Sequence, residues 1–85
     1  MNSTIYKYPL PVTGLPKGAR VLSAGLDPSN KLCIWAEVDP NAPLVDRQIL
    51  LFGTGHELPS PTAIFIATVK DGPFMIHVYD QGETA

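Results

Sequence analysis

Residues 62–69, with the sequence TAIFIATV, form a dense run of β-branched, aromatic and small apolar side chains. Side chains of this kind favour strands over helices. Nine prolines and seven glycines interrupt the rest of the chain so often that residues 29–39 are the longest stretch without either. Because ordinary helices have little room between such breaks, the sequence predicts an all-β fold.

Six short strands are predicted, and two connections have the composition of tight turns. Asp27-Pro28-Ser29-Asn30 and Asp71-Gly72-Pro73 predict hairpins between the second and third strands and between the fifth and sixth. The strands are expected at roughly Thr4–Tyr8, Ala19–Leu26, Lys31–Val38, Arg47–Gly53, Ala63–Lys70 and Phe74–Tyr79. Their spacing is typical of an antiparallel meander, a small barrel or a sandwich. Residues 1–85 are expected to form a single all-β domain.

Alternation along these strands predicts two apolar sheet faces. In the third strand, one face carries Leu32, Ile34, Ala36 and Val38, and the other carries Cys33, Trp35 and Glu37. The last three strands are apolar on both faces as well. Since so short a chain cannot cover two apolar faces with its own loops, either the sheet closes into a barrel or a second copy covers it. A homo-oligomer is the favoured expectation.

The charge pattern limits the partners. With a net charge of −2 and a pI near 5.4, the chain lacks the basic surface that extended nucleic acid requires. Residues 1–31 carry a net charge of +3 and residues 32–85 carry −5. This asymmetry is compatible with a local cationic pocket, with contact between copies, or simply with solvated charges. No apolar run approaches the length of a membrane span and no signal peptide is visible, so a cytoplasmic location is expected.

Residues 53–56, Gly53-Thr54-Gly55-His56, are the most distinctive local motif. They open the connection 53–61. Two glycines let a backbone approach a ligand closely and direct its N–H groups at an anion. The Lys-Ser/Thr pair of a P-loop is missing, and a β-bulge or a simple loop exit explains the same residues.

The candidate reactive residues match no catalytic or metal-binding pattern. His56, Glu57, His77 and Cys33 lie on separate elements without metal-ligand spacing. No cofactor or metal is expected, and the protein is predicted not to be an enzyme. Cys33, the single cysteine, allows no intramolecular disulfide and is expected to be a buried, inert thiol. His77 is expected to be a packed or interfacial residue with backbone partners.

Aromatic and cationic side chains offer a second route to a ligand. Tyr6 and Trp35 are candidates for stacking on a nucleobase, and Arg20 and Arg47 for neutralising a phosphate. Together with the motif 53–56 they form a candidate site for a nucleotide, located between copies. At an oligomer interface the same aromatic residues would serve as anchors.

Five runs together resemble a family of small, largely uncharacterised proteins encoded by bacteriophages and prophages. They are residues 4–10 (TIYKYPL), 15–19 (LPKGA), 32–40 (LCIWAEVDP), 53–56 (GTGH) and 77–79 (HVY). The resemblance covers nearly the whole chain and implies a phage accessory protein in the cytoplasm of an infected bacterium. The expected function is stoichiometric binding that counters host defence. The bound species is either a cyclic or linear nucleotide signal or a host defence protein. The alternative is a structural or assembly accessory of the phage without a small-molecule ligand.

Overall fold

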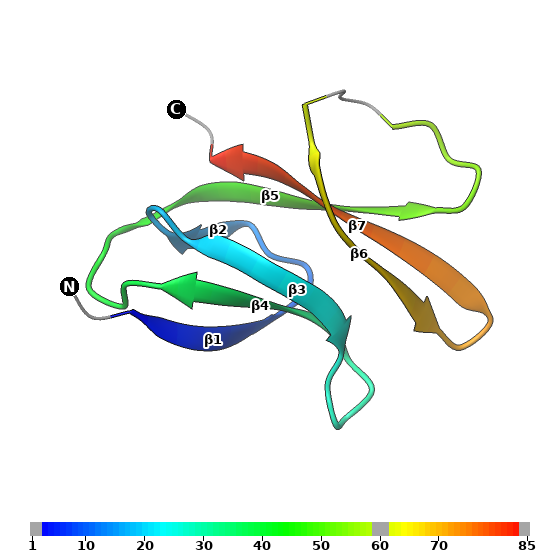
Figure 1. The fold of residues 1–85 in the computed structure, drawn as a ribbon, viewed down its shortest axis with the longest axis horizontal. Coiled ribbons are helices and arrows are strands. Elements are labelled where there is room, and N and C mark those ends of the chain that lie inside the picture. The colour runs from blue at the N-terminus through cyan, green and yellow to red at the C-terminus, as the bar shows by residue number, and fades with distance from the viewer. Residues whose placement is uncertain (1–2, 59–61, 84–85) are drawn as a thin grey trace.

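The computed structural model describes residues 3–58 and 62–83, and the described chain contains seven strands and no helix (Figure 1). The strands are β1 (Thr4–Pro9), β2 (Gly14–Pro16), β3 (Arg20–Leu26), β4 (Leu32–Val38), β5 (Leu44–Gly53), β6 (Ile64–Asp71) and β7 (Phe74–Glu83). The all-β prediction is therefore confirmed. The end of the predicted connection 53–61, residues 59–61, lies outside the described residues.

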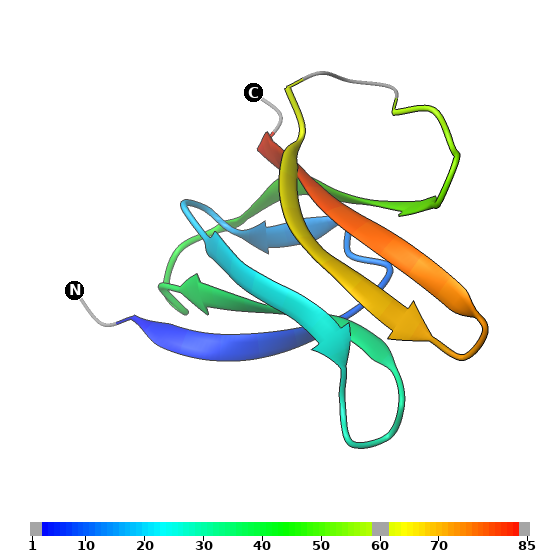
Figure 2. The same cartoon turned by 45° about the vertical axis from the view of Figure 1, so that its right-hand side comes forward.

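Two antiparallel sheets make up the molecule. One has the strand order β1-β4-β3 and the other the order β2-β5-β7-β6 (Figures 1 and 2). Both predicted hairpins are confirmed, because β3 pairs with β4 and β6 pairs with β7. The first strand pairs with β4, so the fold is not a simple meander. Among the described residues the strands do not close into a barrel, and the arrangement has two separate sheets.

The core lies between the two sheets and follows the predicted alternation. Ile34, Ala36 and Val38 of β4 are buried, and they pack with Leu15 of β2, Val69 of β6 and Val78 of β7. Trp35 lies on the other face of β4, where it is half-buried. A Cβ atom added at Gly25 would lie 3.6 Å from Cζ3 of Trp35. The indole ring thus covers this part of the outer face of the three-stranded sheet.

One strand was not predicted, and the start of β5 and the end of β7 differ from the sequence prediction by three or more residues. β2 was not predicted, because a three-residue strand bounded by Gly14 and Pro16 lacks any strand composition. It is held in place by the fully buried Leu15 and by pairing with the beginning of β5. β5 consequently begins at Leu44, and β7 continues to Glu83 through Gly82, whose φ of 92° is suited to glycine.

The β3–β4 turn is fixed by one carboxylate. Oδ1 of Asp27 accepts the backbone N–H groups of Ser29 and Lys31, each at 2.9 Å, and Oδ2 forms an ion pair with Nζ of Lys7 at 2.9 Å. Asn30 completes the turn in the left-handed conformation, with a φ of 63°. The backbone hydrogen bond from Lys31 and the Lys7 ammonium lower the pKa of Asp27 from 3.8 to about 2.

The far ends of β5, β6 and β7 extend beyond the three-stranded sheet (Figures 1 and 2). Several large apolar side chains of these three strands are exposed, among them Leu51, Ile64, Phe65, Phe74 and Met75. The described residues contain no helix that is long and apolar enough to cross a membrane.

Candidate functional site

The motif 53–56 forms a compact loop at the end of β5. The N–H of Gly53 donates to Nδ1 of His56 at 3.1 Å, and the N–H of His56 donates to the Gly53 carbonyl at 3.2 Å. Gly55 has a φ of 91°, which glycine adopts without strain. A Cβ atom at residue 53 would lie 3.0 Å from Cε1 of His56, so the imidazole occupies the space that the missing side chain leaves. Two of the N–H groups expected to face a ligand are therefore used within the loop.

His77 is held between two threonine hydroxyls. Its Nε2 lies 2.7 Å from Oγ1 of Thr54 in the loop, and its Nδ1 lies 2.9 Å from Oγ1 of Thr68 on β6. Thr68 is the cross-strand partner of His77 in the β6–β7 pair. The expected backbone partners are thus replaced by side-chain partners, which fix the orientation of the ring. A threonine hydroxyl can donate or accept, so each ring nitrogen has a hydrogen-bond partner.

An open pocket of about 250 Å³ lies beside this histidine. Its lining consists of Phe52, residues 53–56, Leu58, His77 and Tyr79. A second hollow of about 480 Å³ shares Gly53, Thr54 and His56 and continues along residues 73–76 at the β6–β7 turn. None of the lining residues is Lys, Arg, Asp or Glu, so both hollows are polar only through hydroxyl, imidazole and backbone groups.

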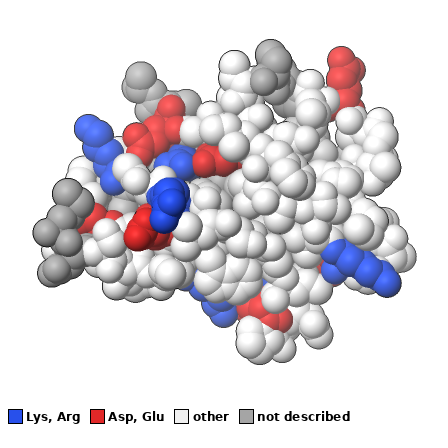
Figure 3. Space-filling view, in the orientation of Figure 1, with Lys and Arg blue, Asp and Glu red and all other residues white. Residues whose placement is uncertain are grey.

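Aromatic residues continue the pocket along the outer face of the four-stranded sheet. Tyr79 meets Phe52 edge-on, with ring centroids 5.7 Å apart, and meets Phe65 in a similar way at 5.5 Å. Phe65 is 53% exposed and Met75 is 44% exposed. We call Phe52, Phe65, Met75 and Tyr79 the outer patch. On the face of the molecule seen in Figure 3, the charged side chains gather mainly on the left, and the right half of this face is mostly uncharged.

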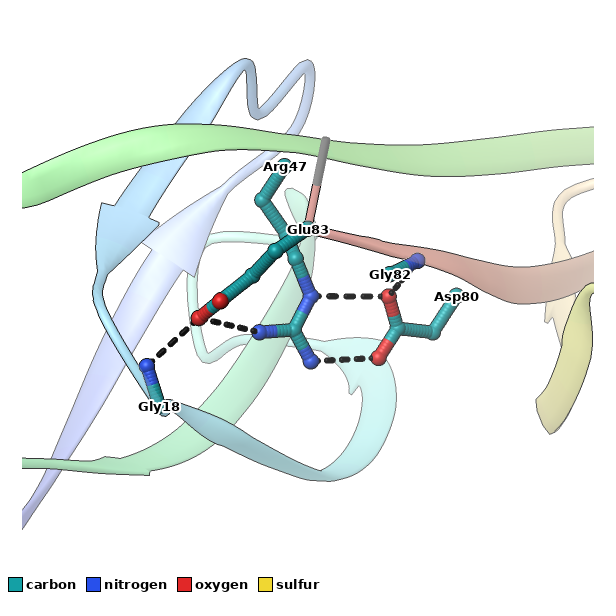
Figure 4. Close-up of polar contacts among 5 residues, drawn as sticks. All are labelled: Gly18, Arg47, Asp80, Gly82 and Glu83. Atoms are coloured by element: carbon teal, nitrogen blue, oxygen red, sulfur yellow. Dashed lines mark hydrogen bonds and ion pairs between the residues drawn. The ribbon is translucent and has the colours of Figure 1, made fainter. Parts of the chain in front are cut away.

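Arg47, a predicted ligand residue, lies on the opposite face of this sheet. Its Nε and Nη2 atoms form paired hydrogen bonds with the Asp80 carboxylate, at 2.9 and 2.6 Å (Figure 4). Its Nη1 lies 3.8 Å from Oε1 of Glu83, which also accepts the N–H of Gly18. Burial alone would raise the pKa of Asp80, but the hydrogen bonds from Arg47 and Gly82 outweigh burial and lower it. We call Arg47, Asp80 and Glu83 the Arg47 cluster.

The other predicted ligand residues lie on the three-stranded sheet. Arg20 pairs with Glu37 at 3.0 Å, and both side chains are well exposed. Trp35 lies on the outer face of that sheet, while Tyr6, on the edge strand β1, has its ring 6.5 Å from that of Tyr8. None of these side chains lines either hollow. Within one copy, the structure brings together only Gly53, Thr54, Gly55 and His56 of the predicted site.

Thr68 and Tyr79 belong to the site but were not predicted to do so, and His77 was given another role. One signal in the sequence identifies the Thr68–His77 pair. The two-residue loop Gly72-Pro73 makes Asp71 and Phe74 cross-strand partners, and counting outward from them places Thr68 opposite His77. The contact with Thr54 has no such signal, because it depends on how the loop folds back over the sheet.

The buried thiol was expected and is found. Cys33 is fully buried in β4, and burial raises its pKa. Within the described part of the chain, no three His, Cys, Asp or Glu side chains are grouped to hold a metal ion.

These features define a small two-sheet all-β domain with an uncharged, partly aromatic hollow on one face. Comparison with known families identifies the family to which the chain belongs. The family model for a domain of unknown function, DUF7352, matches residues 1–85, and the protein belongs to that family. No curated protein and no solved structure gives a significant match to the chain.

Proposed function

We propose that this protein is a non-enzymatic binding module that acts stoichiometrically by occupying a partner protein through the outer patch and the adjoining pocket. The supporting observation is that Phe65 and Met75 are exposed on the face that carries the two hollows. Phe, Tyr and Met are enriched at protein interfaces, and a few such residues usually supply most of the binding energy. In the phage setting that the sequence resemblance implies, the partner is a bacterial defence protein in the host cytoplasm.

Capture of a nucleotide signal is the weaker version of this proposal. A phosphate needs cationic partners or free N–H groups, whereas the loop uses the N–H groups of Gly53 and His56 internally. Arg47 already forms an ion pair with Asp80, and Arg20 lies on the other sheet, where it pairs with Glu37. Neither of the two predicted arginines therefore lines the pocket within one copy. A structural role in phage assembly would use the outer patch as a contact between phage components.

The 2.7 Å contact between Thr54 and His77 also has the spacing of a nucleophile and its general base. The group that orients the imidazole is the Thr68 hydroxyl, which cannot stabilise an imidazolium as the carboxylate of a catalytic triad does. Two N–H groups of the loop also point into the loop itself, so they are unsuited to binding an oxyanion. These features favour binding over catalysis.

A photo-crosslinking amino acid at residue 65 tests the proposal in the bacterial host. Residue 5 is the matched control, because Ile5 is 62% exposed and lies on the other sheet. We expect one host protein to be crosslinked from residue 65 and not from residue 5. With that protein purified, Phe65→Asp should weaken binding at least about tenfold, the loss of a modest hot spot, and Ile5→Asp should leave binding unchanged.

Two results would contradict this proposal. Heat released on titration with a cyclic or linear nucleotide, reduced by Arg20→Glu, would favour the nucleotide version. Multiple turnovers of an ester, peptide or nucleotide that disappear in His77→Asn would identify an enzyme.

A further inference from the structure

The outward edge of β1 is open. In both views β1 lies at one margin of the molecule, with β4 on one side and no described strand on the other (Figures 1 and 2). Its pairing with β4 runs from Thr4 to Pro9 without a β-bulge, whereas the edge strands β3 and β6 both contain register shifts. A regular strand edge with unpaired N–H and carbonyl groups can pair with another strand.

The direction of each backbone group in β1 follows from one hydrogen bond. The N–H of Leu10 donates to the carbonyl of Leu32 at 3.0 Å, and these two residues continue the β1–β4 register. Because backbone groups alternate in direction along an antiparallel strand, those of Tyr6 also point at β4. The N–H and carbonyl groups of Ile5 and Lys7 therefore point away from β4, and no described group bonds to them.

From these groups we infer that the protein forms a two-fold symmetric dimer in which the β1 edges of two copies pair antiparallel, centred on Tyr6. In this register the N–H and carbonyl of Ile5 bond to the carbonyl and N–H of Lys7 of the second copy, and the reciprocal bonds form by symmetry. Pro9, which has no N–H, stands opposite Ser3 at the end of the pairing. None of the outward backbone groups of residues 3–9 is used by another described residue.

The two neighbouring registers are less favourable. A pairing centred on Lys7 would place two lysines directly opposite each other, and Ile5 would face Pro9, which cannot donate. A pairing centred on Ile5 would need Ser3, which lies before the start of β1, to bond to Lys7. The register centred on Tyr6 forms all four central bonds between residues of the strand itself.

The side chains of this edge also fit a second copy. Ile5 and Lys7 lie on the same outer face as Trp35, and Ile5 is 62% exposed. In the dimer the aliphatic stem of Lys7 of the second copy covers Ile5, while its ammonium is already paired with Asp27 at 2.9 Å. Tyr6, which is 46% exposed, faces Tyr6 of the second copy across the axis, and aromatic pairs in this position stabilise antiparallel strands.

A second copy fits this edge better than an unrelated strand does. The open groups are symmetric about Tyr6, and the lysine that would otherwise protect the edge by its charge is neutralised by Asp27 within each copy. The dimer does not rest on the proposed function, because the outer patch lies on the four-stranded sheet. A photo-crosslinker at residue 5 should therefore join two copies of this chain, whereas one at residue 65 should capture the host protein.

A charge-swap experiment tests this dimer. Light scattering over a series of concentrations up to millimolar should give twice the chain mass of 9.2 kDa. Tyr6→Lys and Tyr6→Glu should each give the single-chain mass, because two like charges meet at the axis. An equimolar mixture of the two variants should regain the double mass. Leu22→Lys is the control and should stay dimeric, since Leu22 is 40% exposed in the bulge of β3, on the opposite edge of the same sheet.

Hydrogen exchange on the unmodified protein gives a second measurement that does not depend on the folding of the variants. Exchange of the Ile5 and Lys7 amides should slow at least about tenfold as the protein concentration rises through the dimerisation range. The amide of Tyr6, which bonds to β4, is the internal control and should change less. A single-chain mass at all concentrations would overturn the inference. So would dimers that persist in both Tyr6 variants, or exchange of Ile5 and Lys7 that is independent of concentration.

Discussion

The Arg47 cluster and the outer patch lie on opposite faces of the same four-stranded sheet. Polar groups are buried with charged partners in the cluster, whereas they lie near the surface around the outer patch. In the cluster, Arg47 and Asp80 are only 7% and 9% exposed, and their opposite charges form a direct ion pair. Around the outer patch, hydroxyl and imidazole groups remain near the surface beside the exposed ring of Phe65. The first arrangement joins strands, and the second leaves apolar surface exposed. A cationic side chain in a small domain can therefore hold strands together, and its charge alone does not identify it as a ligand-binding residue.

Breaking the Arg47 cluster should have the largest effect on stability. Arg47→Met leaves the carboxylate of Asp80 buried without its partner, and this should lower the free energy of unfolding by about 3–5 kcal/mol. Arg20→Met is the matched control, because its ion pair with Glu37 is exposed and such pairs contribute about 0–1 kcal/mol. Urea denaturation of both variants measures the difference. Equal losses would mean that the cluster is no more important than a surface ion pair.

Replacing Asp27 should lower the stability by an intermediate amount that depends on pH. Its pKa is about 2 in the folded protein, against a normal value of 3.8. The ionised carboxylate therefore stabilises the fold above pH 3.8, and this stabilisation is lost as the pH falls toward 2. Asp27→Asn should be less stable than the unmodified protein at neutral pH, and the two should converge over that window. Denaturation at a series of pH values measures this. A difference that does not change with pH would contradict the role of the charge.

Changing the outer face should have the smallest effect on stability. His77→Phe removes two hydrogen bonds to threonine hydroxyls that are open to solvent, so we expect a loss of about 1 kcal/mol or less. Thr68→Val, which removes one of the two bonds, is the matched control. The same His77→Phe change should alter binding of a partner protein at the pocket. A loss of stability as large as that of Arg47→Met would place His77 among the residues that hold the fold.

The sequence predicted the all-β class, both tight hairpins and the core face of β4, because these depend on composition, turn residues and alternation. Residues 53–56 were singled out as a candidate anion-binding loop or a simple loop exit, and the structure places them in the lining of a pocket. The partners of Arg47 were not predictable, since Asp80 and Glu83 reach it across an irregular register near Gln48 and Ile49. Trp35 and Tyr6 were grouped with that loop on chemistry alone, and nothing in one sequence says which sheet carries which side chain.

Cys33 has a practical consequence, because β4 is the central strand between β1 and β3. The thiol is fully buried and donates to the Lys31 carbonyl at 3.2 Å. A thiol-modifying reagent therefore reacts only when β4 separates from its neighbours, so the rate of modification follows opening of the three-stranded sheet. Cys33 is thus a natural probe of the opening rate, which needs no engineered label and does not react while the native state persists.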